Sequence, residues 1–166
     1  MSEPREILAN DHEAVGEVLQ QLLTVLQNND VRESYARLDL LWARLAVHIR
    51  AEHLHLFPAI AARVTEAATV IENLRADHDF FMRELAQAIG KLREGTLTSV
   101  LDTVREVEKR LASHNEIEEK QVYHWVGSVL TDSEQIALAT RINEELEKRP
   151  PRFSLETWAN RSIDHE

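Results

Sequence analysis

Apolar residues recur at helical spacing along most of the chain. In the first segment they stand three, four or seven residues apart and so share one helix face: Leu8, Val15, Leu19, Leu22 and Leu26. The same spacing predicts long helices over residues 4–28, 30–57, 69–94 and 98–125. Four helices with apolar stripes indicate an all-α protein in which the stripes are buried against one another.

Residues with known preferences for helix ends mark the boundaries of these segments. Asp30, with Glu33 three residues later, is typical of a helix start. Pro58 is expected to kink or end the second helix, and Gly95 suits the end of the third. The stretch "TDSE" at 131–134 resembles a capping box and predicts a fifth helix, which the following "RPP" would end.

The chain contains an internal repeat. Residues 73–85, "NLRADHDFFMREL", match residues 7–19, "ILANDHEAVGEVL", in their leucines and in an Asp-His pair. A shift of 66 residues (78 minus 12) aligns the two segments, and it also carries the second predicted helix onto the fourth. The repeat predicts two copies of one helical hairpin.

Polar residues interrupt the apolar stripes at matching positions. The first and third predicted helices each carry one histidine there, whereas the second and fourth carry a histidine and a glutamate four residues apart: His12, His78, His48 with Glu52, and His114 with Glu118. Residues four apart lie on the same helix face. These side chains should therefore point into the core with the neighbouring leucines.

The chain length fixes the height of the four histidines. His12 and His48 are 36 residues apart, as are His78 and His114, and the midpoint of each pair falls in a predicted turn. Residues equidistant from the turn lie side by side in an antiparallel hairpin. In a four-helix bundle the four histidines are thus expected in one layer, with the two glutamates one turn away.

Burying such a layer without partners would be very costly. It could be a hydrogen-bonded polar layer that fixes helix register, but its symmetry favours a metal centre. Iron, manganese or zinc suit imidazole and carboxylate ligands better than magnesium or calcium do. Two metals bridged by the two glutamates and by one oxide or hydroxide would keep one octahedral position open on each metal.

Composition narrows the function classes. The 166 residues carry a net charge of −10 without a basic cluster, which argues against nucleic acid and anionic membranes as partners. The chain has no cysteine, which excludes thiolate metal sites and disulfides. No apolar stretch is long enough for a membrane span, and the first residues lack the apolar segment of a signal peptide, so a cytoplasmic location is expected.

The ordered set of a histidine, HxxxE, a histidine and HxxxE resembles the hemerythrin-like, or HHE cation-binding, family over about residues 5–126. The resemblance implies an up-down-up-down antiparallel four-helix bundle with two iron ions and a bridging oxo or hydroxo group, with manganese or zinc as the alternative metals. By motif position, His12 and His48 would hold one iron, and His78 and His114 the other. The bridging ligands would be the glutamates of the two HxxxE motifs, Glu52 and Glu118.

One departure from the family pattern bears on function. Oxygen-carrying hemerythrins have a further histidine four residues after the one in the third helix, where this chain has Met82, whose repeat mate is Gly16. This departure argues against reversible oxygen storage. The resemblance then implies a di-iron protein that binds or reacts with dioxygen, nitric oxide or peroxide, and it leaves open whether the protein is an enzyme. The alternatives are an iron or oxygen sensor or an iron store that acts through a partner, and a metal-free interaction bundle.

The sequence also suggests residues that could support the six ligands. His55 lies on the second stripe and, with Met82 and Gly16, is a candidate for contact with the ligands from outside. Asp11 and Asp77 precede two of the histidines and could orient neighbours, although exposed charge is the simpler interpretation. His53 is interpreted as a boundary residue.

Two regions are expected along the chain. Residues 1–130 would form the hemerythrin-like four-helix bundle. Residues 131–166 would form a C-terminal helix and an extended tail packed on the bundle or on a partner. The apolar side chains available for that packing in the tail are Phe153, Leu155 and Trp158.

Overall fold

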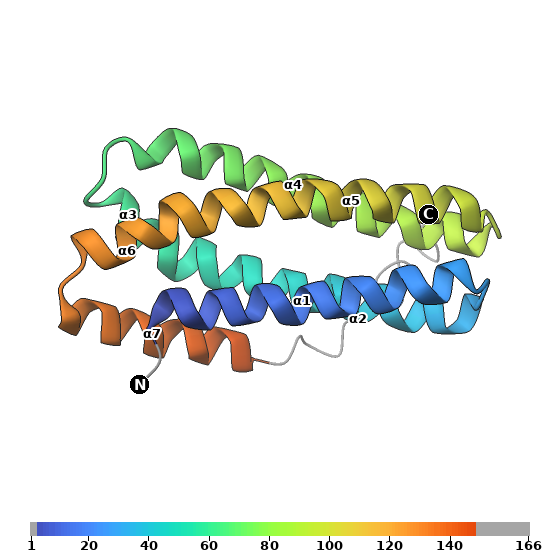
Figure 1. The fold of residues 1–166 in the computed structure, drawn as a ribbon, viewed down its shortest axis with the longest axis horizontal. Coiled ribbons are helices and arrows are strands. Elements are labelled where there is room, and N and C mark those ends of the chain that lie inside the picture. Colours follow the sequence, from blue (N-terminus) through green and yellow to red (C-terminus); the bar gives the residue numbers. More distant parts are fainter. Residues whose placement is uncertain (1–2, 149–166) are drawn as a thin grey trace, which may run out of the picture.

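Two helical hairpins make up most of the structure, a computed structural model that describes residues 3–148. Helices α1 (Pro4–Gln27) and α2 (Val31–Ala51) form the first hairpin, and α4 (Ala67–Arg93) and α5 (Leu97–Ile117) form the second (Figure 1). The described residues contain helices and turns and no strand. The prediction of an all-α protein is confirmed.

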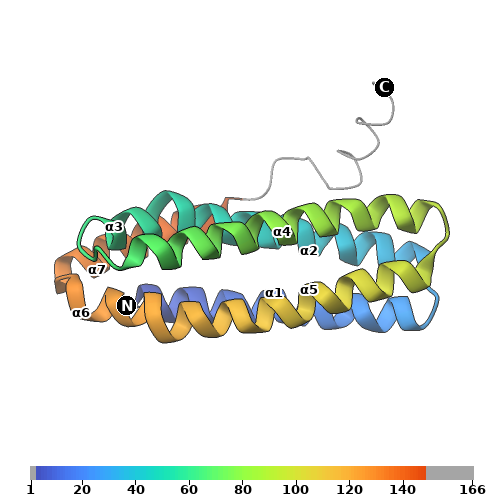
Figure 2. The same ribbon diagram turned by 90° about the horizontal axis from the view of Figure 1, so that it is seen from above.

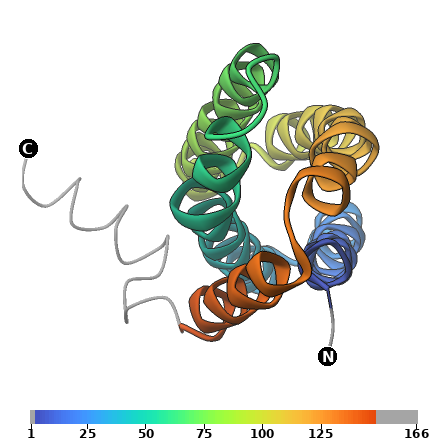
Figure 3. The ribbon, with the colours of Figure 1, turned by 90° about the vertical axis from the view of Figure 1, so that its left-hand side faces the viewer.

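The four long helices surround a common core. Each helix of one hairpin packs on a helix of the other, α2 on α4 and α1 on α5. The end-on view of Figure 3 shows this arrangement, and Figure 2 shows that the hairpins share one long axis. No helix within residues 3–148 combines the length and apolarity needed to cross a bilayer.

A π-helical turn interrupts the second helix of each hairpin. Turn η1 (Glu52–Leu56) links α2 to α3 (Phe57–Ala61), and η2 (Glu118–Val122) links α5 to α6 (Tyr123–Val129). Both π turns begin at the glutamate of an HxxxE motif. Such turns contain one extra residue and are frequent at functional sites.

The π turns correct two sequence expectations. The backbone N–H of Phe57 bonds to the carbonyl of Glu52, five residues earlier, and the helix continues past Pro58 to Ala61. Of the two outcomes expected at Pro58, a kink or an end of the helix, the end does not occur. The extra residue also moves the buried stripe by one position. Leu56 is fully buried where the regular helical period had selected His55.

The core consists of two apolar clusters with the polar layer between them. The cluster toward the hairpin turns contains Leu22, Leu38, Phe81 and residues packed around them. The cluster at the other end contains Leu8, Phe57, Ile60 and their neighbours. Apolar packing on both sides shields the polar layer from water.

Helix α7 (Asp132–Glu147) packs alongside the first hairpin, against α1, α2 and η1 (Figure 1). A capping box of Thr131 and Glu134 starts it, as predicted. The buried Ile142 joins the second apolar cluster, and the buried carboxylate of Glu145 accepts a hydrogen bond from His55. The tail predicted to follow, including Phe153, Leu155 and Trp158, lies outside the described residues.

A glycine in a hairpin turn and a glycine in the preceding helix allow a matched test of backbone conformation. Asn29 and its repeat mate Gly95 both have positive φ angles, 57° and 80°. We predict that Gly95→Ala costs about 1 kcal/mol, because a Cβ disfavours this left-handed conformation. Gly90→Ala should instead stabilise the protein, since Gly90 is helical and its added Cβ would meet no atom within 4 Å. Urea unfolding measures the free energy of unfolding of both variants. A change in the same direction in both would contradict the prediction.

Candidate metal centre

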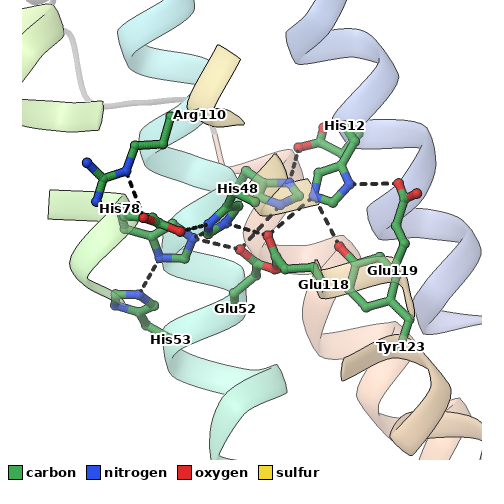
Figure 4. A network of polar contacts seen from close by, with 12 residues as sticks. His12, His48, Glu52, His53, His78, Arg110, Glu118, Glu119 and Tyr123 are labelled. Atoms are coloured by element: carbon green, nitrogen blue, oxygen red, sulfur yellow. Dashed lines mark hydrogen bonds and ion pairs between the residues drawn. The ribbon is translucent and has the colours of Figure 1, made fainter. Parts of the chain in front are cut away.

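Six buried polar side chains meet in the middle of the bundle (Figure 4). The four histidines are at most 8% exposed, and both glutamates are fully buried. They come from all four long helices and both π turns: His12 from α1, His48 from α2, Glu52 from η1, His78 from α4, His114 from α5 and Glu118 from η2.

The histidines of each hairpin lie side by side, as their equal distances from the turn predict. The ring centroids of His12 and His48 are 4.6 Å apart, and those of His78 and His114 are 4.7 Å apart. Each pair belongs to one group of ligand atoms that all lie within 4.8 Å of one another. Both glutamates belong to both groups, so their carboxylates lie where they could bridge two metal ions.

Two aspartates fix the orientation of one histidine in each hairpin. Nδ1–H of His48 donates to Asp11 over 2.7 Å, and Nδ1–H of His114 donates to Asp77 over 3.0 Å. Arg110 donates to the other oxygen of Asp77. A carboxylate can only accept, so the proton belongs on Nδ1, and Nε2 of each ring faces inward. Outer partners of this kind fix the tautomer of metal-binding histidines and raise their basicity.

The other two histidines have outer partners that differ between the repeats. Nδ1–H of His12 donates to the carboxylate of Glu119 over 3.1 Å. The corresponding atom of His78 lies 2.8 Å from Nε2 of His53. Glu119 and His53 are repeat mates, and each directly follows a buried glutamate. A carboxylate thus supports one ring where an imidazole supports the other.

A second difference between the repeats lies beside the same two rings. The hydroxyl of Tyr123 lies 3.1 Å from Nε2 of His12 and donates to it. Its repeat mate Phe57 stacks on His78, with ring centroids 6.0 Å apart. Tyr123 is 3% exposed, and burial together with the charge of Glu52 raises the pKa of its phenol well above the ordinary value.

One buried ion pair dominates the electrostatics of the metal-free layer. Burial alone would lower the pKa of His48, but the charge of Glu52 and the hydrogen bond to Asp11 outweigh it and raise this pKa to about 10. Burial would likewise raise the pKa of Glu52, but attraction to His48 holds it far below its ordinary range. Without metal, a proton on His48 therefore balances part of the negative charge.

Three other histidines, His12, His114 and His53, favour the neutral form. Burial and the charge of His48 lower the pKa of His12. Burial and the charge of His78 lower the pKa of His114 to about 4. Burial, followed by the charge of His78, also lowers the pKa of His53 to about 4. Nδ1 carries the proton of His12 and of His114, so Nε2 of each ring has a lone pair. In the metal-free layer Nε2–H of His78 donates to Nε2 of His114 over 3.0 Å, and metal binding must displace this proton.

The inward atoms fit a cation. Nε2 of His114 lies 2.6 Å from a carboxylate oxygen of Glu118, which brings two acceptors together because Nδ1 carries the proton of His114. Neither oxygen of Glu52 or Glu118 accepts a hydrogen bond in the described structure. An enclosed cavity of about 10 Å³ lies among the ligands, roughly the space of one water molecule or ion. Buried acceptors that face one another require a positive charge between them.

The structure gives the three outer residues expected from the sequence the following neighbours. His55 is displaced from the stripe by the π turn and bonds to Glu145. Met82 packs against the first apolar cluster, and Gly16 lines a shallow depression of the surface, where a Cβ would meet nothing within 4 Å. Gly16 therefore does not serve a close helix approach.

Residues that the sequence interpretation undervalued take their place. Asp11 and Asp77, considered mainly as exposed charges, each hold a histidine. His53 contacts His78 and is more than a boundary residue, and Glu119 and Tyr123 were missed. The internal repeat carried a signal for all of them, because they are repeat mates of one another or of Phe57 and stand next to ligands or one turn beyond them.

The opposite pKa shifts predict that the metal-free protein is most stable near pH 6.5. The raised pKa of His48 stabilises the fold fully below about 6.5, and this contribution is lost as the pH rises toward 10. The lowered pKa of His114 favours folding above about 6.5, and this contribution is lost as the pH falls toward 4, since the unfolded chain then binds the proton more readily. At about 1.36 kcal/mol per pKa unit, the alkaline limb should amount to at most about 5 kcal/mol and the contribution of His114 to the acid limb to at most about 3 kcal/mol.

Urea unfolding of the protein kept metal-free with a chelator, at several pH values, tests this dependence of stability on pH. His48→Leu should flatten the alkaline limb and preserve the acid limb, whereas His114→Leu should do the reverse. Stability that keeps increasing between pH 6.5 and about 9 would contradict the assignment of the raised pKa to His48.

Comparison with known proteins agrees with the geometry. No curated protein matches the chain. The family model described as the hemerythrin HHE cation binding domain matches residues 3–126, which include all six buried ligands and both π turns. A match over most of the chain shows the family, as the sequence resemblance predicted. The chain belongs to the hemerythrin HHE cation-binding domain family.

Proposed function

We propose that the protein is a non-haem di-iron protein, built as an up-down-up-down bundle, that binds or reacts with dioxygen, nitric oxide or peroxide. The observation that carries the proposal is the set of imidazole nitrogen and carboxylate oxygen atoms that face one another in the buried layer. Four imidazole Nε2 atoms and two carboxylates form two groups that share both glutamates. Within residues 3–148 neither carboxylate accepts a hydrogen bond, and Nε2 of His114 lies 2.6 Å from a carboxylate oxygen of Glu118, close enough for both atoms to bind one cation.

The charge of the surroundings supports two ions of at least two positive charges each. Two carboxylates lie at the centre, and three more accept hydrogen bonds from the histidines: Asp11, Asp77 and Glu119. Neutral histidines leave these five groups uncompensated, except where Arg110 pairs with Asp77. Nitrogen and oxygen ligands in this ratio suit iron, with manganese or zinc as the less fitting alternatives.

The bundle would supply orientation and exclusion of water. The outer hydrogen bonds hold the rings of His12, His48 and His114 with Nε2 inward before any metal arrives, and they lower the cost of ordering the ligands. Bound iron would supply the redox and ligand-binding chemistry. The apolar clusters above and below keep bulk water away from the centre.

The size of the cavity limits the ligand. It holds about one water-sized molecule, and besides the ligands it is lined by Val15, Leu45, Leu111 and Asn115. Three of these side chains are apolar and pack tightly in the core. Without rearrangement the space accommodates a diatomic molecule or peroxide better than an organic substrate.

Metal content tests the proposal directly. We expect about two irons per chain after anaerobic loading and desalting, the number set by the two ligand groups. Glu52→Ala or Glu118→Ala should lose most of the iron, because each carboxylate belongs to both groups. The double variant His48→Leu/His114→Leu should lose iron but keep its helical circular dichroism, since leucine fills a seam position.

Glu116→Ala is the matched control, because Glu116 lies half a turn before Glu118 but its side chain is 61% exposed and pairs with Lys120. It should retain the iron content of the unmodified protein. One zinc per chain, or full iron content in both glutamate variants, would contradict the assignment of the two carboxylates as bridges.

The ligand count makes a further prediction about oxygen. Within residues 3–148 only four imidazoles belong to the ligand groups, and Met82, at the position of the carriers' additional histidine, packs in the apolar core. We expect air to oxidise the reduced iron protein, with no long-lived oxygen adduct. Stopped-flow absorption followed by removal of oxygen measures this, and quantitative release of intact dioxygen would show that the protein is a carrier.

A further inference from the structure

The two halves of the centre differ most at one pair of repeat mates. Tyr123 and Phe57 occupy equivalent positions, each five residues after a central glutamate and each packed against a histidine of the layer. Only the tyrosine carries a hydrogen-bond donor. The ribbon and side chains of Figure 4 place its hydroxyl toward the inner face of His12, between α1 and η2.

The hydroxyl of Tyr123 points at an atom that a metal would use. It donates to Nε2 of His12 over 3.1 Å, whereas Nδ1 of the same ring is engaged by Glu119. Metal coordination at Nε2 consumes its lone pair, so the phenol must then find another acceptor. A donor that is 3% exposed has little access to water, and leaving it unpaired is unfavourable.

The new acceptor must lie close to the metal at this position. The hydroxyl is already directed at the ligand atom, so a small molecule held by the same metal would come within its reach. On the other side of the centre, the ring of Phe57 stacks on His78 at an interplanar angle of 10° and has nothing to donate. The hydrogen bond is thus offered at one metal position only.

We propose that Tyr123 donates a hydrogen bond to small ligands at the metal held by His12 and His48, and that it makes this metal the preferred binding position. The proposal rests on the proposed di-iron function. It assigns Tyr123 a role in ligand binding, whereas the six ligands alone would determine metal content. The two functions are therefore separable by measurement.

Azide binding to the oxidised, iron-loaded protein tests the proposal, because azide is a small anion that accepts hydrogen bonds. Tyr123→Phe removes the hydroxyl and keeps the ring, so iron content should stay unchanged and azide affinity should fall about tenfold. Tyr35→Phe is the matched control, since Tyr35 is a partly buried tyrosine packed against the first apolar cluster. It should change azide affinity less than about twofold.

Resonance Raman spectra provide a second readout. The vibrations of bound azide should shift when the unmodified protein is transferred to D₂O, and this shift should disappear in Tyr123→Phe. Equal azide affinity of the two proteins, with full iron content, would overturn the role of Tyr123 and leave the di-iron function standing.

Three other results would overturn the proposal in a different way. A strong visible phenolate-to-iron charge-transfer band that disappears in Tyr123→Phe would show that the tyrosine is a metal ligand, as would loss of iron from that variant alone. Absence of iron from the unmodified protein would refute the di-iron function and this proposal together.

Discussion

The structure depends on the need to neutralise acceptors that the bundle buries. Glu52 and Glu118 are fully buried, and neither accepts a hydrogen bond. In the metal-free state the positive charge of a protonated His48 beside Glu52 meets part of this need, in line with the raised pKa of His48. Metal ions would meet it more fully, and their binding must then displace that proton. Folding, protonation and metal binding are therefore coupled through one layer of side chains.

The π turns begin at the two carboxylates of that layer. Each turn begins at a central glutamate and adds a residue to the helix, which shifts the buried stripe from His55 to Leu56 in the first hairpin. The second apolar cluster packs below the turns and closes the layer on that side. Helix α7 contacts η1, where Glu145 binds His55 three residues beyond Glu52. The geometry of the centre and the packing of α7 thus share one short segment.

The internal repeat gives the centre symmetry, and a few substitutions remove it. Asp11 accepts a hydrogen bond from His48, and its repeat mate Asp77 accepts the equivalent bond from His114. By contrast, Glu119 supports His12 where His53 supports His78, and Tyr123 replaces Phe57. A histidine that donates a hydrogen bond to a carboxylate is more basic, and binds a metal more strongly, than one whose partner is a neutral imidazole. The two halves therefore offer metals different surroundings although their ligands are the same.

The sequence by itself determined the helices, the hairpin repeat and the convergence of the six buried histidines and glutamates, because helical period and equal distances from a turn can be read along the chain. It also fixed the start of α7 through the Thr131–Glu134 capping box. Only the tertiary structure decided which polar residues stand behind the ligands. The helical period places His55 and Gly16 near the histidine stripes, but His55 bonds to Glu145 and a Cβ at Gly16 would meet no atom within 4 Å. By contrast, His53 and Glu119 contact histidines that are 25 and 107 residues away in the sequence. The reason is physical. The extra residue of a π turn changes the helix face on which each later side chain lies, and the regular helical period does not include this change. Contacts between helices depend on which face a side chain occupies.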